Sequence, residues 1–210
     1  MTTARRLSSD ERRTQLIEIG MRLVAASSFD AVPIDRVARE AGISRSLLFH
    51  YFPDKRAFQV AVAEASANEL LAGTEPDPTL PPDERLRASL HAFVDYVSER
   101  DEAFVSLIRG ATGGDPRLRE VFDRAHTVVA NRILEGVGIA PGTESALLRI
   151  AVRGWVAFLE EAVVVWLAAG EPSQQDLVEL LEAALVGAVA AADVEGIRPV
   201  IDLFADRVSG

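Results

Sequence analysis

The sequence predicts an all-α fold of about nine helices, and three observations support this. Apolar residues recur at three- and four-residue spacing in almost every segment, whereas a strand would alternate apolar and polar residues. Stretches rich in glycine, proline and serine separate the periodic segments. The chain has 210 residues, of which 49% are hydrophobic, and this is enough for a small N-terminal domain joined to a larger one.

Three helices are expected in the first quarter of the chain. The first helix buries residues spaced three and four apart: Leu16, Ile19, Gly20, Leu23 and Val24. A second helix over 33–41 begins at a proline and ends at Gly42. Ser44 can cap a third helix over 44–52, which Pro53 stops. Because only two residues join the second and third helices, this pair is predicted to be a helix-turn-helix.

The remaining elements divide into a connecting helix and a helical body. Asp54 can cap a fourth helix that runs to about Leu71, and the proline-rich segment 73–82 marks a boundary. We therefore assign 1–56 to a head, 57–72 to a connecting helix and 83–210 to a body. Body helices are expected over 83–100, 102–109, 115–135, 143–169 and 173–192, and the tail 194–210 is left unassigned.

Charge is unevenly distributed along the chain. The net charge is −10, yet residues 1–56 carry ten Arg and Lys against seven Asp and Glu, a net charge of +3. A mildly basic head on an acidic body directs attraction for phosphate to one end. The chain has no cysteine, which excludes disulfides and thiolate sites. No signal segment is recognisable, and the longest apolar run, 162–170, is half a membrane span, so we expect a cytoplasmic protein with no membrane partner.

The third helix is predicted to present a recognition face. At ~1.5 Å per residue it is about 13 Å long and fits within a major groove of DNA. Leu48 and Phe52 would face inward and Leu47 partly so. The outward positions are Arg45, Ser46, Phe49 and His50. Aromatic and basic side chains that face outward together suit a ligand large enough to cover them.

The stretch "VAREAGISRSLLFHYFPDKRAF" resembles the DNA-binding head of TetR-type transcriptional repressors. The resemblance covers about residues 12–62 and implies a homodimer that binds a palindromic operator in double-stranded DNA and is released by a small apolar inducer. The DNA-contacting positions it implies are Arg45, Ser46, Leu47, Phe49, His50, Tyr51 and Lys55. Arg45 is suited to a guanine edge, and Tyr51 and Lys55 match family positions that contact phosphates.

This head departs from the family pattern at three positions. Leu47 stands where threonine is common and Phe49 where tyrosine is usual, so two hydroxyl groups that bond phosphates are missing. Pro33 replaces the usual serine or threonine cap of the second helix. We therefore predict fewer phosphate contacts and a larger share of apolar contact. Arg5, Arg6, Arg12 and Arg13 are candidates for a compensating basic arm, and a disordered charged terminus is the alternative for Arg5 and Arg6.

The resemblance also implies that the body pairs two heads and holds the inducer. The predicted dimer interface comprises Val163, Leu167, Leu177, Leu181, Ala184, Gly187 and Ala188. The predicted ligand pocket comprises Phe93, Tyr96, Val97, Phe104, Ile108, Phe122, His126, Trp155, Phe158 and Leu159. The alternative for each set is packing within one chain.

Other function classes have weaker support. His91 and Asp95 lie four residues apart, but no third metal ligand is placed with them, and no Gly-rich phosphate loop or nucleophile elbow is present. We therefore expect no enzyme activity, no cofactor and no metal. The alternative function is a ligand-free DNA-binding regulator that a partner protein controls. The sequence identifies neither the inducer nor the operator, and it does not decide between repression and activation.

Overall fold

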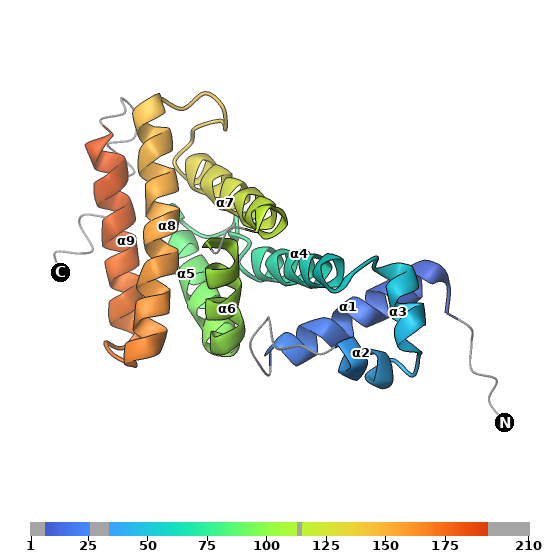
Figure 1. Ribbon diagram of the computed structural model, residues 1–210. Helices are drawn as coiled ribbons and strands as arrows, with labels where there is room; N and C mark the ends of the chain where they lie inside the picture. The colour runs from blue at the N-terminus through green and yellow to red at the C-terminus, as the bar shows by residue number, and fades with distance from the viewer. Residues whose placement is uncertain (1–6, 26–33, 113–114, 193–210) are drawn as a thin grey trace. The chain divides into compact units, whose positions relative to one another are not determined.

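The computed structural model describes residues 7–25, 34–112 and 115–192. These residues form helices and connecting turns with no strand, which confirms the all-α prediction (Figure 1). Within them nine helices are found: α1 Ser9–Ala25, α2 Ile34–Glu40, α3 Arg45–Tyr51, α4 Lys55–Gly73, α5 Pro82–Ser98, α6 Asp101–Thr112, α7 Pro116–Gly136, α8 Ala146–Ala169 and α9 Gln174–Ala191. No helix among the described residues is long and apolar enough to cross a membrane.

The helix ends follow local signals in the sequence. Ser145 accepts a hydrogen bond from the Leu148 N–H and so caps α8, which therefore begins at Ala146 and not at the expected 143. Ser173 and Asp176 form a reciprocal capping box at the start of α9. The tail 194–210 and Pro33 lie outside the described residues.

The chain folds as two compact units. The first contains Met1–Glu69 and Glu99–Phe122, and the second contains Leu70–Ser98 and Asp123–Gly210. Helix α6, which the sequence places in the body, thus belongs with the head and contacts α1. We call these the head unit and the body unit.

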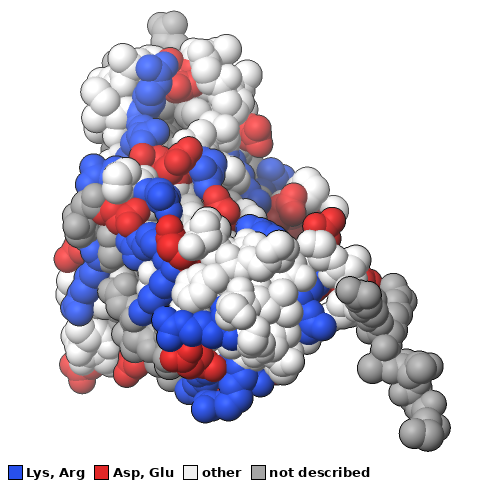
Figure 2. All heavy atoms as spheres, turned by 45° about the vertical axis from the view of Figure 1, so that its right-hand side comes forward, with Lys and Arg blue, Asp and Glu red and all other residues white. Residues whose placement is uncertain are grey.

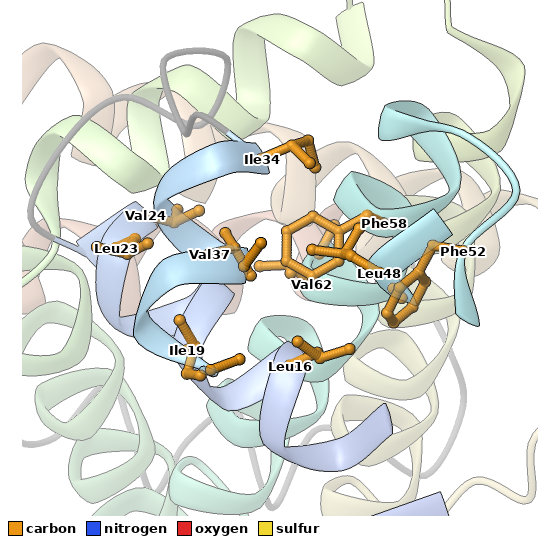
Figure 3. Packing of buried hydrophobic residues seen from close by; sticks show 14 of the residues in the cluster. Leu16, Ile19, Leu23, Val24, Ile34, Val37, Leu48, Phe52, Phe58 and Val62 are labelled. Carbon is orange, nitrogen blue, oxygen red and sulfur yellow. The ribbon is translucent and has the colours of Figure 1, made fainter. Parts of the chain in front are cut away.

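The head unit is built around one apolar cluster, which Figure 3 shows. Leu16 of α1, Val37 of α2 and Leu48 of α3 are completely buried in it. The Phe52 and Phe58 rings meet edge to face, with centroids 5.0 Å apart. Burial of these side chains from four helices fixes the position of the short α3, which as an isolated seven-residue helix would not be stable.

Close helix packing in the head depends on Gly20. A Cβ atom at this position would lie 2.5 Å from Val62 Cγ2 and 2.7 Å from Phe58 Cζ. These distances are too short for carbon atoms, so the absence of a side chain lets α1 approach α4.

The body unit is held by packing of α9 against α8 and α5. The Trp155 indole N–H of α8 donates a hydrogen bond of 2.9 Å to the buried Leu181 carbonyl of α9. Arg87 of α5 donates to both carboxylate oxygens of Glu182, through Nε at 3.0 Å and Nη2 at 2.7 Å. The buried Glu182 carboxylate therefore has a bidentate partner, which offsets its loss of hydration.

Candidate nucleic-acid interface

Two short helices and a left-handed glycine form the predicted helix-turn-helix. Gly42 has φ +66°, a conformation that a side chain would strain, and the Ile43 N–H returns to the Ala38 carbonyl at 3.0 Å. The Ser44 hydroxyl then accepts from the Leu47 N–H at 3.2 Å and caps α3. These local contacts turn the chain between α2 and α3 and fix the start of α3.

The inner face of α3 lies where the sequence predicts it, with one difference. Leu48 and Phe52 are four residues apart, so they share one face of the helix and are buried. Leu47, expected to be partly buried, has 39% of its surface exposed. A neighbouring residue in a helix is rotated by about 100°, which turns Leu47 away from the face of Leu48.

The adjacent aromatic side chains have different environments. Phe49 and Tyr51 are half-buried against the apolar cluster, whereas His50 is exposed. The rings of His50 and Tyr51 meet edge to face at 5.6 Å. The Arg45 guanidinium carbon lies 5.5 Å from the centre of the Phe49 ring. The exposed face of α3 thus combines cationic, polar and apolar groups, including Ser46.

Arg45 also forms an ion pair with α2. Its Nη1 lies 3.1 Å from Oδ1 and 3.3 Å from Oδ2 of Asp35. The side chains of Arg45 and Asp35 are 61% and 70% exposed. The sequence does not reveal Asp35 as a partner of Arg45, because the two residues are ten positions apart and lie on different helices. Its only local signal is an acidic residue in the first turn of α2.

The two basic residues that begin α4 differ in their surroundings. Asp54 caps the helix as predicted, since its carboxylate accepts from the Ala57 N–H at 2.6 Å. Lys55 is the first residue of α4 and is exposed, and the N-terminal end of a helix favours an anion such as a phosphate. Arg56 instead pairs through Nε with Asp115, within the head unit.

Asp115 also caps the start of α7. Its carboxylate accepts from the backbone N–H groups of Leu118 at 3.1 Å and Arg117 at 2.8 Å. The bond from Leu118 holds the pKa of Asp115 below its ordinary value, and Arg56 lowers that pKa further. The carboxylate is therefore ionised at neutral pH and keeps Arg56 paired within the protein.

The proposed basic arm is partly integrated into the head. The Arg13 guanidinium lies 5.1 Å above the Phe52 ring, and Arg12 donates to Gln15 at 2.6 Å. Both arginines belong to α1, whereas Arg5 and Arg6 of the predicted arm lie outside the described residues. Positive and negative side chains are interspersed on the face shown in Figure 2, and no single basic patch covers it.

Two family models match this chain over most of its length. Residues 16–62 match the bacterial regulatory proteins of the tetR family, and residues 82–188 match the tetracyclin repressor-like C-terminal domain. The chain belongs to the TetR family. Members of this family are DNA-binding transcriptional regulators and not enzymes, as the sequence predicts.

Individual TetR-family relatives support the same assignment. The HTH-type transcriptional activator FasR of Mycolicibacterium smegmatis is 24% identical over 81% of this chain and 79% of its own. A tetR-family regulator from Streptomyces coelicolor superposes with a TM-score of 0.81 at 27% identity, covering 95% of this chain and 90% of the other. The regulator FadR from Bacillus subtilis, solved with stearoyl-CoA, has a TM-score of 0.61 at 16% identity, covering 84% and 97%.

The residues predicted to pair two TetR subunits are only partly accessible. Val163, Leu177 and Leu181 are buried by their own chain, so they offer no surface to a second copy. Of the others, Gly187 is exposed, and Leu167, Ala184 and Ala188 are half-buried.

An exposed apolar stripe on α8 was not distinguished by the sequence reasoning. Leu147, Ile150, Phe158 and Val165 recur at helical spacing along one face of α8 and are all exposed. Leu180 is similarly exposed on α9. In the sequence, apolar residues occur on nearly every side of α8. The sequence therefore does not indicate which side the rest of the chain leaves exposed.

The predicted pocket residues are distributed over both units. Phe104, Ile108 and Phe122 belong to the head unit, and the other seven belong to the body unit. In the body unit Val97, Trp155 and Leu159 are buried, and Phe93 and Tyr96 are half-buried. Phe158 differs from these because it is 40% exposed, on the same face as Ile150.

The most distinctive polar contact among the predicted pocket residues joins α7 to α8. His126 Nε2 lies 2.7 Å from Glu160 Oε1, and both side chains are mostly buried. The contact with Glu160 raises the pKa of His126 above its ordinary value. Asp95, considered above as a metal ligand with His91, instead accepts a 2.8 Å hydrogen bond from Gln174. The residues that the structure describes contain no group of three metal-binding side chains.

Proposed function

We propose that this TetR-family regulator is a cytoplasmic repressor that binds a palindromic operator as a homodimer, with α3 in the major groove. The carrying observation is the capped, well-anchored α3, which exposes Arg45, Ser46, Leu47 and His50 beside the half-buried Phe49. A side chain that reaches base edges from a fixed helix provides sequence readout, and we assign the phosphate contacts to Lys55 and Tyr51.

Selection of bound DNA from a random duplex pool tests this function. The full-length protein should enrich an inverted repeat whose half-sites are about one helical turn, or a multiple of it, apart. Enrichment of no sequence would contradict the proposal. Transcription from a promoter that carries the recovered site then decides the direction of control. Repression is expected, and activation, as in the name of the relative FasR, would contradict that part.

The role of Lys55 as a phosphate contact can be separated from base readout. Lys55→Ala should weaken binding to every sequence and reduce the salt slope of log affinity by about one unit. Arg149→Ala is the matched control, because it removes one exposed positive charge from the body, where Arg149 pairs with Glu144. If both variants change the slope equally, Lys55 has no special position.

Support for dimerisation comes from the exposed apolar stripe of α8 and from Leu180 of α9. A large apolar stripe on a water-soluble chain is unfavourable unless a partner covers it. A second copy is the occupant required by a two-fold operator, since the inverted half-sites match a two-fold axis of the protein.

The proposed effector is an apolar small molecule bound by the body. The support is the set of half-buried aromatic side chains on α5 together with the His126–Glu160 pair, which would provide a polar anchor. Long-chain acyl-CoA is the first class to test, because the Bacillus subtilis relative was solved with stearoyl-CoA.

Titration of acyl-CoA into the operator complex tests the effector. Release of DNA is expected, because coupling requires that the ligand bind the DNA-free state more tightly. Free coenzyme A serves as the control without an acyl chain. Tight ligand binding with unchanged operator affinity would favour the alternative function, a regulator controlled by a partner protein.

A further inference from the structure

We infer that Asp35 sets operator specificity by positioning Arg45. Asp35 lies in the first turn of α2 and Arg45 is the first residue of α3, so their contact joins both helices of the helix-turn-helix. The inference rests on the proposed function, because it requires α3 to lie in the major groove.

The Arg45 guanidinium is held from two sides. Its Nη1 contacts both carboxylate oxygens of Asp35, at 3.1 Å and 3.3 Å, and its planar group lies near the Phe49 ring, 5.5 Å from the ring centre. A guanidinium carries five N–H donors, and the contacts with Asp35 use Nη1. The Nη2 and Nε hydrogens therefore remain suited to the O6 and N7 acceptors of a guanine.

Holding this side chain before DNA arrives favours binding to the correct base. Arginine loses much rotamer freedom when it is fixed in a complex, and a side chain that is already oriented loses less. A fixed guanidinium also meets an incorrect base pair in an unsuitable geometry. Both effects increase the difference in affinity between the operator and other sequences.

Fold stability does not account for the ion pair. Both side chains are more than half exposed, and exposed ion pairs contribute little to folding. A carboxylate beside DNA also weakens the attraction to phosphate for every sequence. Asp35 should therefore decrease non-specific affinity and increase discrimination. A residue that only repels phosphate, or only supports the fold, would not produce these opposite effects.

The chain provides a matched control for the charge. Glu40 lies on the same helix and pairs with Arg36 at 3.2 Å, an i, i+4 contact that does not involve α3. Glu40→Gln removes one negative charge from α2, as Asp35→Asn does, but leaves the contacts of Arg45 in place.

The experiment compares full-length wild type, Asp35→Asn, Asp35→Ser, Glu40→Gln and Arg45→Ala on the selected operator. Affinities are measured for the operator, for every single-base-pair change in it and for an unrelated duplex. Wild type should discriminate by roughly 5- to 100-fold at the base pair that Arg45 reads. In Asp35→Asn the discrimination at that same base pair should be about 3- to 10-fold smaller than in wild type. This is the effect expected if Arg45 still contacts the base but is less well oriented. Its affinity for the unrelated duplex should be unchanged or higher.

Three further results are expected. In the Arg45→Ala background, Asp35→Asn should leave the discrimination unchanged, because the two residues act through one contact. Glu40→Gln should keep the wild-type discrimination. Asp35→Ser should show the same loss of discrimination as Asp35→Asn, and serine is chosen because it is favourable at the start of a helix. Circular dichroism checks that each variant is folded.

Three results would overturn the inference: unchanged discrimination in Asp35→Asn, a change at a base pair that Arg45→Ala does not affect, or an equal change in Glu40→Gln. The second would mean that Asp35 contacts a base itself. If wild type selects no sequence, the proposed function fails and this inference fails with it. If wild type selects an operator and Asp35→Asn discriminates equally well, only this inference fails.

Discussion

The head and body units differ in what their surfaces leave uncovered. Among the described residues seven large hydrophobic side chains are exposed. Six of them lie in the body unit, and the seventh, Leu47, lies in the head unit. The head therefore buries its apolar groups internally and presents charged and polar groups, which suit DNA. The body leaves apolar surface exposed on its longest helix, which suits a protein partner.

The largest expected effect tests whether the two units are independently stabilised. Phe52→Ala removes a buried ring that contacts Phe58 and should destabilise the head by about 3–5 kcal/mol. Operator binding should be lost while amide hydrogen exchange in α8 and α9 stays slow. Leu181→Ala, at a fully buried position of the body, should instead destabilise the body unit and leave amide exchange in the head slow. If each variant loses protection from amide hydrogen exchange in both units, the two units unfold together.

The next prediction concerns the partner of the body. Ile150 is 68% exposed, so Ile150→Glu should leave the folded monomer intact but place a charge in the proposed interface. Dimer affinity should fall by about 2 kcal/mol or more if the residue lies at the centre of the contact. Sedimentation measures the mass, and Arg153→Glu, an exposed substitution on the same helix, is the comparison. An unchanged mass would remove α8 from the interface.

Glycine substitutions should give opposite results in the two units. Gly20→Ala forces a Cβ against Val62 and Phe58, which should cost about 1–3 kcal/mol in the head. A Cβ atom at Gly154 of α8 would meet no neighbouring element of its own chain within 4 Å, so Gly154→Ala should stabilise the monomer by roughly 1 kcal/mol. Thermal unfolding of both variants checks the signs. Stabilisation by Gly20→Ala would contradict the close packing of α1 on α4.

Helix caps provide a smaller comparison with matched chemistry. Ser44→Ala and Ser173→Ala each remove a side chain that accepts a backbone N–H at a helix start, and each should cost about 1 kcal/mol. Only the first should weaken operator binding, because it loosens α3. Equal loss of DNA affinity in both variants would mean that the caps act through global stability.

The smallest effect is a pH dependence confined to the body. Because Glu160 raises the pKa of His126, the pair stabilises the fold fully below pH 6.5, the ordinary pKa of the group, and this contribution is lost as pH rises through the folded-state pKa. Asp123 strengthens the shift and Arg153 opposes it. His126→Gln should therefore be more destabilising at pH 6 than at pH 9 in denaturant unfolding. A larger loss at pH 9 would reverse the assigned sign.

The sequence predicts the helix-turn-helix well because its signals are local. Gly42, Ser44 and Pro53 each act on the backbone within a few residues, so the helix ends follow from the residues themselves. The inward Leu48 and Phe52 follow from four-residue spacing. The Arg45–Asp35 contact does not, because it depends on the angle at which α2 and α3 cross.

The sequence predicts less about the long helices because their patterns are ambiguous. An apolar helix such as α8 has several sides that could be buried, and only the packed structure shows that Val163 is covered whereas Val165 is exposed. The association of α6 with α1 joins segments far apart in the chain, which periodicity does not reveal. For the same reason the residues predicted for the dimer interface include Leu177, which the structure shows to be buried within its own chain.

The Trp155 indole, which donates a hydrogen bond to the Leu181 carbonyl, is an intrinsic fluorescent probe of the body unit. The chain has two tryptophans, Trp155 and Trp166, and both belong to α8. Intrinsic tryptophan emission therefore reports on the surroundings of α8, and a blue-shifted band from the buried Trp155 would disappear when the α8–α9 packing is lost. Events in the head need a separate label, such as a dye on the operator.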